Sequence, residues 1–108
     1  MSTRRSFLLA AAAMLPAAWV SGMDMGVPVY GQLLSRNSGP VPGCTSYLVH
    51  ERLGRSTPSR TDNDGRFGWT AIPVRPEPYY LELYWGSKLI YRSQVFVKGP
   101  LVLQPIVL

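Results

Sequence analysis

From Val27 onward, apolar and polar residues alternate in short runs, a pattern typical of β-strands with one buried face. No window places apolar residues at helical spacing, and frequent prolines break any long helix in this part of the chain. The pattern predicts six short strands, at residues 27–33, 44–51, 67–72, 79–85, 89–97 and 101–108. Turn residues separate the strands about every ten residues. These features predict an all-β fold, a small antiparallel β-sandwich.

The fourth predicted strand has the clearest alternation. One face is expected to carry the apolar residues Tyr79, Leu81, Leu83 and Trp85. The opposite face is expected to carry Tyr80, Glu82 and Tyr84.

The local amino-acid composition between the strands predicts several turns and loops. Residues 35–43 form a turn rich in Ser, Asn, Gly and Pro, and residues 52–64 form a polar loop. Gly86-Ser87 predicts a tight hairpin, and Lys98-Gly99-Pro100 predicts a turn into the last strand. Pro105 confines that last strand to a sheet edge or a bulge.

Residues 1–22 have the layout of a secretory signal peptide. A cationic head precedes the apolar stretch 7–20, whose helical length of about 21 Å is shorter than the ~30 Å hydrocarbon core. A stable transmembrane span is therefore not expected. The run from Thr3 to Leu8 resembles the twin-arginine export motif, although an ordinary signal peptide with two arginines is the alternative. Export predicts a periplasmic or secreted protein.

Charge and composition narrow the function classes. The chain carries 11 basic and 6 acidic residues, and removing Arg4 and Arg5 with the leader leaves 9 against 6. This modest excess in an exported chain argues against nucleic acid as a partner. One Cys and one His exclude a disulfide framework within the chain and the usual sets of zinc ligands. No cofactor is expected.

Three stretches stand out for their order and spacing: Val29-Tyr30-Gly31-Gln32-Leu33, Gly39-Pro40-Val41-Pro42-Gly43-Cys44, and Thr61-Asp62-Asn63-Asp64-Gly65-Arg66-Phe67 with the following Ile72-Pro73 and Tyr79-Tyr80-Leu81-Glu82-Leu83. Together they resemble the carboxypeptidase regulatory-like domain, a transthyretin-like β-sandwich. The resemblance implies one such domain over residues 27–108, after the leader. In larger family members the module accompanies a zinc peptidase domain. This chain has no His-x-x-Glu ligand pair, so peptidase activity is not implied.

Two candidate reactive sites have simpler interpretations. Asp62-Asn63-Asp64-Gly65 matches the first half of a calcium loop, but the twelfth position is Pro73, so an ordinary hairpin turn is favoured. Cys44 and His50 lie roughly 20 Å apart on one predicted strand, too far for a nucleophile and its base. Cys44 is expected to be a small buried residue, and His50 a solvated residue at the strand end.

Arginines and tyrosines supply the candidate binding residues. Arg52, Arg55, Arg60 and Arg66 gather in and around the polar loop, where anionic partners or plain solubility are the two interpretations. Tyr80 and Tyr84 share one face of a strand, and exposed tyrosines anchor partner proteins or stack on sugars, although cross-strand pairing also explains them. The candidate binding residues are Tyr80, Tyr84, Tyr91, Arg52 and Arg55.

The sequence therefore predicts a non-catalytic, exported module that mediates protein–protein interaction in the cell envelope. The alternative is a carbohydrate-binding domain that uses the same tyrosines. A transthyretin-like hydroxyisourate hydrolase is excluded by its requirement for several histidines and a C-terminal Tyr-Arg-Gly-Ser, since this chain has one His and ends in Ile106-Val107-Leu108.

Overall fold

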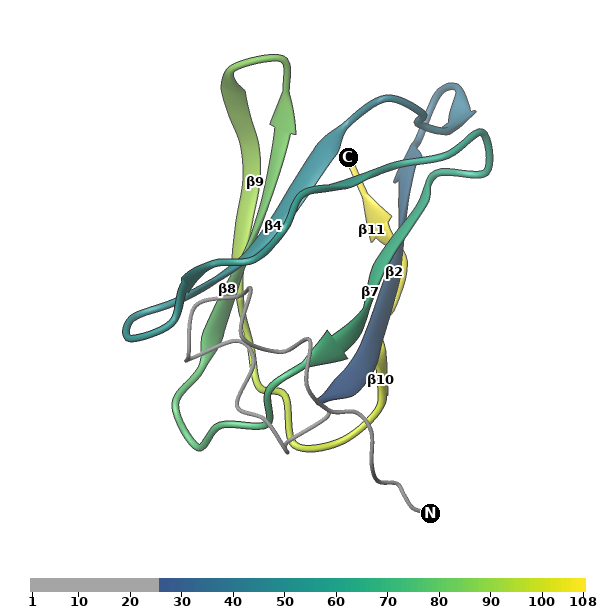
Figure 1. Ribbon diagram of the computed structural model, residues 1–108. Coiled ribbons are helices and arrows are strands. Elements are labelled where there is room, and N and C mark those ends of the chain that lie inside the picture. Colours follow the sequence, from purple (N-terminus) through teal and green to yellow (C-terminus); the bar gives the residue numbers. More distant parts are fainter. Residues whose placement is uncertain (1–25) are drawn as a thin grey trace.

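The computed structural model describes residues 26–108, which form two layers of β-strands (Figure 1). No helix occurs among these residues, so none of them provides a helical membrane span. The expected all-β sandwich is confirmed. The predicted signal peptide at 1–22, with its helix, lies outside the described residues.

The first sheet is built around β2 (Val27–Ser35). Its other strands are β3 (Gly39–Pro40), β7 (Arg66–Ile72), β10 (Leu101–Val102) and β11 (Ile106–Val107). β3 and β7 pair with β2 in the antiparallel direction, whereas β10 and β11 pair with it in parallel.

The last predicted strand, 101–108, therefore differs from the expected antiparallel arrangement. After β9 the chain returns to the first sheet and runs along β2 in the same direction (Figure 1). Pro105 lies between β10 and β11, where its missing N–H removes a ladder bond and the strand is interrupted. Because β10 and β11 pair with β2 and with no other described strand, the segment lies at a sheet edge, which confirms the edge position expected from Pro105.

The second sheet has the order β5-β4-β8-β9, with β6 also paired with β4. Its strands are β4 (Thr45–His50), β5 (Gly54–Arg55), β6 (Ser59–Arg60), β8 (Tyr79–Trp85) and β9 (Lys88–Val95), all antiparallel. The segment 52–64 is thus not a plain polar loop, because β5 and β6 both hydrogen-bond to β4.

The core lies between the two sheets. It consists of buried residues of the strands and of the positions that flank them: Val29, Leu33, Cys44, Leu48, Phe67, Trp69, Ile72, Tyr79, Leu81, Leu83, Val95, Val97 and Ile106. On β8 the predicted apolar face is confirmed for Tyr79, Leu81 and Leu83. It is wrong for Trp85, which is 57% exposed because it lies at the β8–β9 turn, past the last core residue of the strand.

A turn before Phe67 is confirmed, but it is not a hairpin between paired strands, because it joins β6 of the second sheet to β7 of the first. Oδ1 of Asp62 accepts hydrogen bonds from the backbone N–H groups of Asp64, at 2.8 Å, and Arg66, at 2.9 Å. Gly65 has φ of +75°, and a Cβ at this position would collide with the carbonyl oxygen of Leu33. Phe67 then enters the core.

Candidate functional site

The outward side of the second sheet gathers aromatic and charged side chains from four strands. Cross-strand partners in this sheet point to the same side. Since Tyr47 is opposite Glu82, Glu82 is opposite Arg92, and Leu48 and Leu81 fill the core side, these charged and aromatic residues face outward. We call this surface the tyrosine face, formed by Tyr47, Arg55, Tyr80, Glu82, Tyr84 and Arg92.

Glu82 is the centre of the tyrosine face. The Tyr84 hydroxyl donates to its Oε1 at 2.9 Å, and Nε of Arg92 donates to its Oε2 at 3.3 Å. Nη2 of Arg55 lies 3.9 Å from the same Oε1. The Glu82 side chain is only 14% exposed, so its neighbours shield it from water. One carboxylate thus accepts hydrogen bonds from one arginine and one tyrosine, and a second arginine lies close to it without a hydrogen bond.

The arginines lie over tyrosine rings. The guanidinium carbon of Arg55 is 4.2 Å from the ring centroid of Tyr47 and 5.8 Å from that of Tyr84, and the two rings meet edge to face. Arg92 lies 4.2 Å from the centroid of Tyr80. These are cation–π distances. The tyrosine face is therefore ordered before any ligand arrives.

The ionisation of Tyr84 reflects this arrangement. The hydrogen bond from its hydroxyl to Glu82 raises the pKa of Tyr84, and desolvation and the negative charge of Glu82 act in the same direction. Arg55 opposes the shift. Tyr84 is therefore a neutral hydrogen-bond donor over the whole physiological range.

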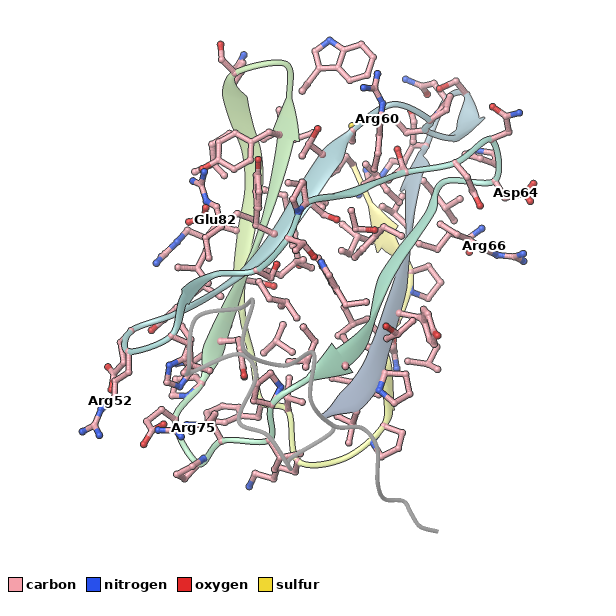
Figure 2. All side chains as sticks on the ribbon, viewed as in Figure 1. Arg52, Arg60, Asp64, Arg66, Arg75 and Glu82 are labelled. Carbon is pink, nitrogen blue, oxygen red and sulfur yellow. The ribbon has the colours of Figure 1, made fainter. Side chains whose placement is uncertain are left out.

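The structure brings together only some of the sequence-predicted site residues. Tyr80, Tyr84 and Arg55 lie on the tyrosine face. Arg52 lies in the β4–β5 turn and points away from Glu82 into solvent (Figure 2). Tyr91 is opposite Leu83 and packs against the core, so it is on the other side of the sheet.

The four arginines around residues 52–66 do not form one patch. Arg60 is opposite Thr45, and Thr45 is opposite Tyr84. Arg60 therefore points outward from the second sheet, as Arg55 does. Arg66 belongs to β7 in the first sheet, and Figure 2 shows it on the opposite side of the molecule from Glu82. Its ion pair with Asp64 spans 3.9 Å.

Two members of the tyrosine face, Tyr47 and Arg92, were missed by the sequence analysis, which placed Glu82 on this face without naming it as a binding residue. Alternation along residues 44–51 places Tyr47 on the face opposite Leu48, which is a local signal. Pairing Glu82 with Arg92 requires the cross-strand register, which alternation alone does not supply.

A small cavity adjoins the tyrosine face at the β8–β9 turn. Its volume is about 230 Å³, and it is lined by Thr45, Tyr47, Arg55, Tyr84, Gly86 and Ser87. Trp85 and Leu89, at the same end of the hairpin, are both exposed large apolar residues. The cavity therefore combines a cation, hydroxyl groups and aromatic walls beside an apolar surface.

A second, larger groove separates the β5–β6 segment from β7. It measures about 740 Å³, and its mostly apolar lining includes Leu53, Pro58, Trp69 and Ile72. The indole N–H of Trp69 donates to the carbonyl oxygen of Thr57 across the groove and ties its two sides together.

His50 is buried, which corrects the expectation of a solvated strand-end residue. The side chain is fully enclosed, and Nδ1 accepts backbone N–H bonds from Arg52, at 3.0 Å, and Leu53, at 3.3 Å. Nε2 lies 3.0 Å from Oε1 of Glu77. Because Nδ1 accepts, Nε2 carries the proton and donates to Glu77. Both nitrogens are engaged in holding the β4–β5 turn to the β7–β8 loop.

Cys44 is completely buried, as expected for a small core residue. Desolvation raises the pKa of its thiol, which disfavours the nucleophilic thiolate. Its backbone N–H donates to Oγ1 of Thr61, and its carbonyl oxygen accepts from the Thr61 N–H. Cys44 thus anchors the start of β4.

Among residues 26–108, no three His, Cys, Asp or Glu side chains converge in a way that would hold a metal ion. No model of a known protein family matches the chain, and a search of curated proteins finds no match.

Proposed function

We propose that this chain is an exported, non-catalytic β-sandwich module that docks on another protein of the cell envelope through the tyrosine face. The observation that carries the proposal is the ordered set of tyrosines and arginines around Glu82. Tyrosine and arginine are enriched among the residues that dominate the energy of protein interfaces.

Prior ordering lowers the cost of binding. Immobilising a long side chain at an interface costs about 0.5–1.5 kcal/mol. On the tyrosine face, Arg55 and Arg92 already lie over tyrosine rings and against the Glu82 carboxylate. A partner that contacts these side chains therefore meets groups whose freedom is already restricted.

The environments of Cys44 and His50 support a non-catalytic role. The Cys44 thiol is buried with a raised pKa, and both ring nitrogens of His50 are engaged by the protein. Neither group meets a substrate without local unfolding. Export is supported by the sequence of residues 1–22, and the order of the three motifs supports a carboxypeptidase regulatory-like domain.

The carbohydrate-binding alternative uses the same residues. Stacking a sugar requires an open aromatic face. Guanidinium groups lie 4.2 Å from the ring centroids of Tyr47 and Tyr80, so a sugar must compete with them. This competition favours a protein partner over a glycan.

The test compares quantitative capture of envelope proteins by the full chain and by two variants. Tyr80→Ala combined with Tyr84→Ala removes two rings of the tyrosine face. Tyr30→Ala removes an exposed tyrosine of the first sheet and is the matched control. We expect the double variant to lose one specific protein by about tenfold or more, with Tyr30→Ala unchanged.

Two results contradict the proposal. One is equal capture by all three proteins, and the other is equal loss in the double variant and in Tyr30→Ala. Cell fractionation of the same strains tests export, which requires the chain in the periplasm or medium.

A further inference from the structure

The cavity at the β8–β9 turn is bounded by groups of complementary chemistry. Tyr47 and Tyr84 form aromatic walls whose ring centroids are 5.9 Å apart. The side chain of Arg55 also lines the cavity, as do Thr45 and Ser87, which carry hydroxyl groups. A volume of about 230 Å³ is suited to a single side chain rather than to a large cofactor.

Arg55 differs from Arg92 in how firmly Glu82 holds it. Arg92 donates a hydrogen bond to Oε2 at 3.3 Å. Arg55 lies 3.9 Å from Oε1, beyond hydrogen-bond distance, and that oxygen already accepts the Tyr84 hydroxyl at 2.9 Å. A guanidinium has five N–H donors. The donors of Arg55 are thus oriented by the tyrosine rings without being consumed by Glu82.

The surrounding charge favours an anion. Three arginines, Arg55, Arg60 and Arg92, point outward from this sheet, whereas Glu82 is their acidic neighbour within the tyrosine face. Within residues 26–108, no acidic side chain forms an ion pair with Arg60. An acidic partner therefore matches the excess positive charge of this sheet.

From these observations we infer that Arg55, held between Tyr47 and Tyr84, anchors a carboxylate from an acidic segment of the partner protein. The inference rests on the proposed function and identifies the chemistry of the partner. The carboxylate enters the cavity and accepts N–H bonds from the guanidinium. A neighbouring apolar residue of the same segment packs on Leu89, which is opposite Tyr84 on the outward side and is 44% exposed.

The experiment measures binding of a capped hexaglutamate peptide to the full chain by calorimetry. Arg55→Gln removes the charge and the forked donor. Arg55→Lys keeps the charge without the fork. Arg66→Gln is the matched control, because Arg66 is also exposed and also lies 3.9 Å from a carboxylate, but on the opposite side of the molecule (Figure 2).

We expect Arg55→Gln to weaken peptide binding by about tenfold or more, Arg55→Lys to weaken it less, and Arg66→Gln to leave it unchanged. Equal losses in Arg55→Gln and Arg66→Gln would overturn the inference, because general charge attraction then explains binding. Undiminished binding to Arg55→Gln would also overturn it, as would the absence of binding to the wild type.

A second arm uses oligogalacturonate, which carries carboxylates on sugars. Tighter, Arg55-dependent binding of this probe than of the peptide would overturn the acidic protein segment and assign the cavity to an acidic glycan. The protein-docking proposal is judged separately. If the capture experiment depends on Tyr80 and Tyr84 but not on Arg55, the docking module stands and the carboxylate anchor is rejected.

Discussion

The Tyr84 hydroxyl donates a 2.9 Å hydrogen bond to Oε1 of Glu82, and this bond joins the aromatic and charged parts of the tyrosine face. The same oxygen lies 3.9 Å from Nη2 of Arg55. Glu82 therefore fixes the direction of Tyr84 and limits the movement of Arg55. The organisation of the surface depends on one carboxylate that the partner protein itself need not touch.

This bond predicts a late-titrating tyrosine. Because deprotonation breaks the bond to Glu82, the Tyr84 pKa lies above its usual range. In an alkaline titration followed by phenolate absorbance, Tyr84→Phe is expected to remove one late component. Glu82→Gln is expected to move that component to lower pH. An unchanged titration curve in Glu82→Gln would show that the bond does not control Tyr84.

The two faces of β8 predict stability losses of different size. Leu81 is buried against the first sheet, so Leu81→Ala is expected to lower the free energy of unfolding by about 2–5 kcal/mol. Changing Tyr80, its neighbour on the outer side, to Ala is expected to lower the free energy of unfolding by about 1 kcal/mol or less. Urea unfolding of both variants measures the difference. Similar losses would contradict the assignment of the two faces.

The two nitrogens of His50 predict different effects for two polar replacements. Asn retains an acceptor near the Nδ1 position, whereas Gln retains a donor near the Nε2 position. His50→Gln leaves the N–H groups of Arg52 and Leu53 without their acceptor and is expected to lower the free energy of unfolding by about 1–3 kcal/mol. His50→Asn is expected to lower it less. Thermal unfolding checks the order, and the reverse order would show that the contact with Glu77 dominates.

Asp62 predicts a loss of stability in acid. The N–H bond from Arg66 lowers the pKa of the Asp62 carboxyl below its usual range, with a further contribution from the N–H of Asp64. A lowered folded-state pKa stabilises the protein above the unfolded value of about 3.9 and loses this effect as pH falls through the folded value. Asp62→Asn is expected to flatten this acid dependence of unfolding, with Asp64→Asn as the control. If the free energy of unfolding of Asp62→Asn fell in acid as steeply as that of the wild type, the hydrogen bonds of the Asp62 carboxylate would not be the cause of the acid dependence.

The strands could be predicted from the sequence because alternation is a local property. Tyr79, Leu81 and Leu83 reveal their buried face without knowledge of any partner strand. The polar Ser46 fits the same inner face because its hydroxyl donates to the carbonyl oxygen of Ser59. Asp62 and Gly65 likewise revealed their turn through local backbone chemistry.

The features that could not be predicted depend on pairings between residues that are distant in the sequence. A register shift between Leu83 and Tyr84 aligns Tyr91 with Leu83 and Leu89 with Tyr84, so Tyr91 turns inward and Leu89 outward. Without this shift, simple alternation along residues 89–97 would place Leu89 and Tyr91 on the same side of the sheet. The contact of the buried His50 with Glu77 and the parallel pairing of β10 and β11 with β2 are also non-local.

Photo-crosslinking inside the cell tests the docking role of the tyrosine face most directly. Leu89, opposite Tyr84, and Tyr30, on the outer side of the first sheet, are each 44% exposed. A photoreactive phenylalanine derivative at either position leaves the Glu82 contacts intact. The account predicts a discrete crosslinked protein from position 89 and none from position 30. The same products from both positions, or a product from position 30 alone, would contradict it.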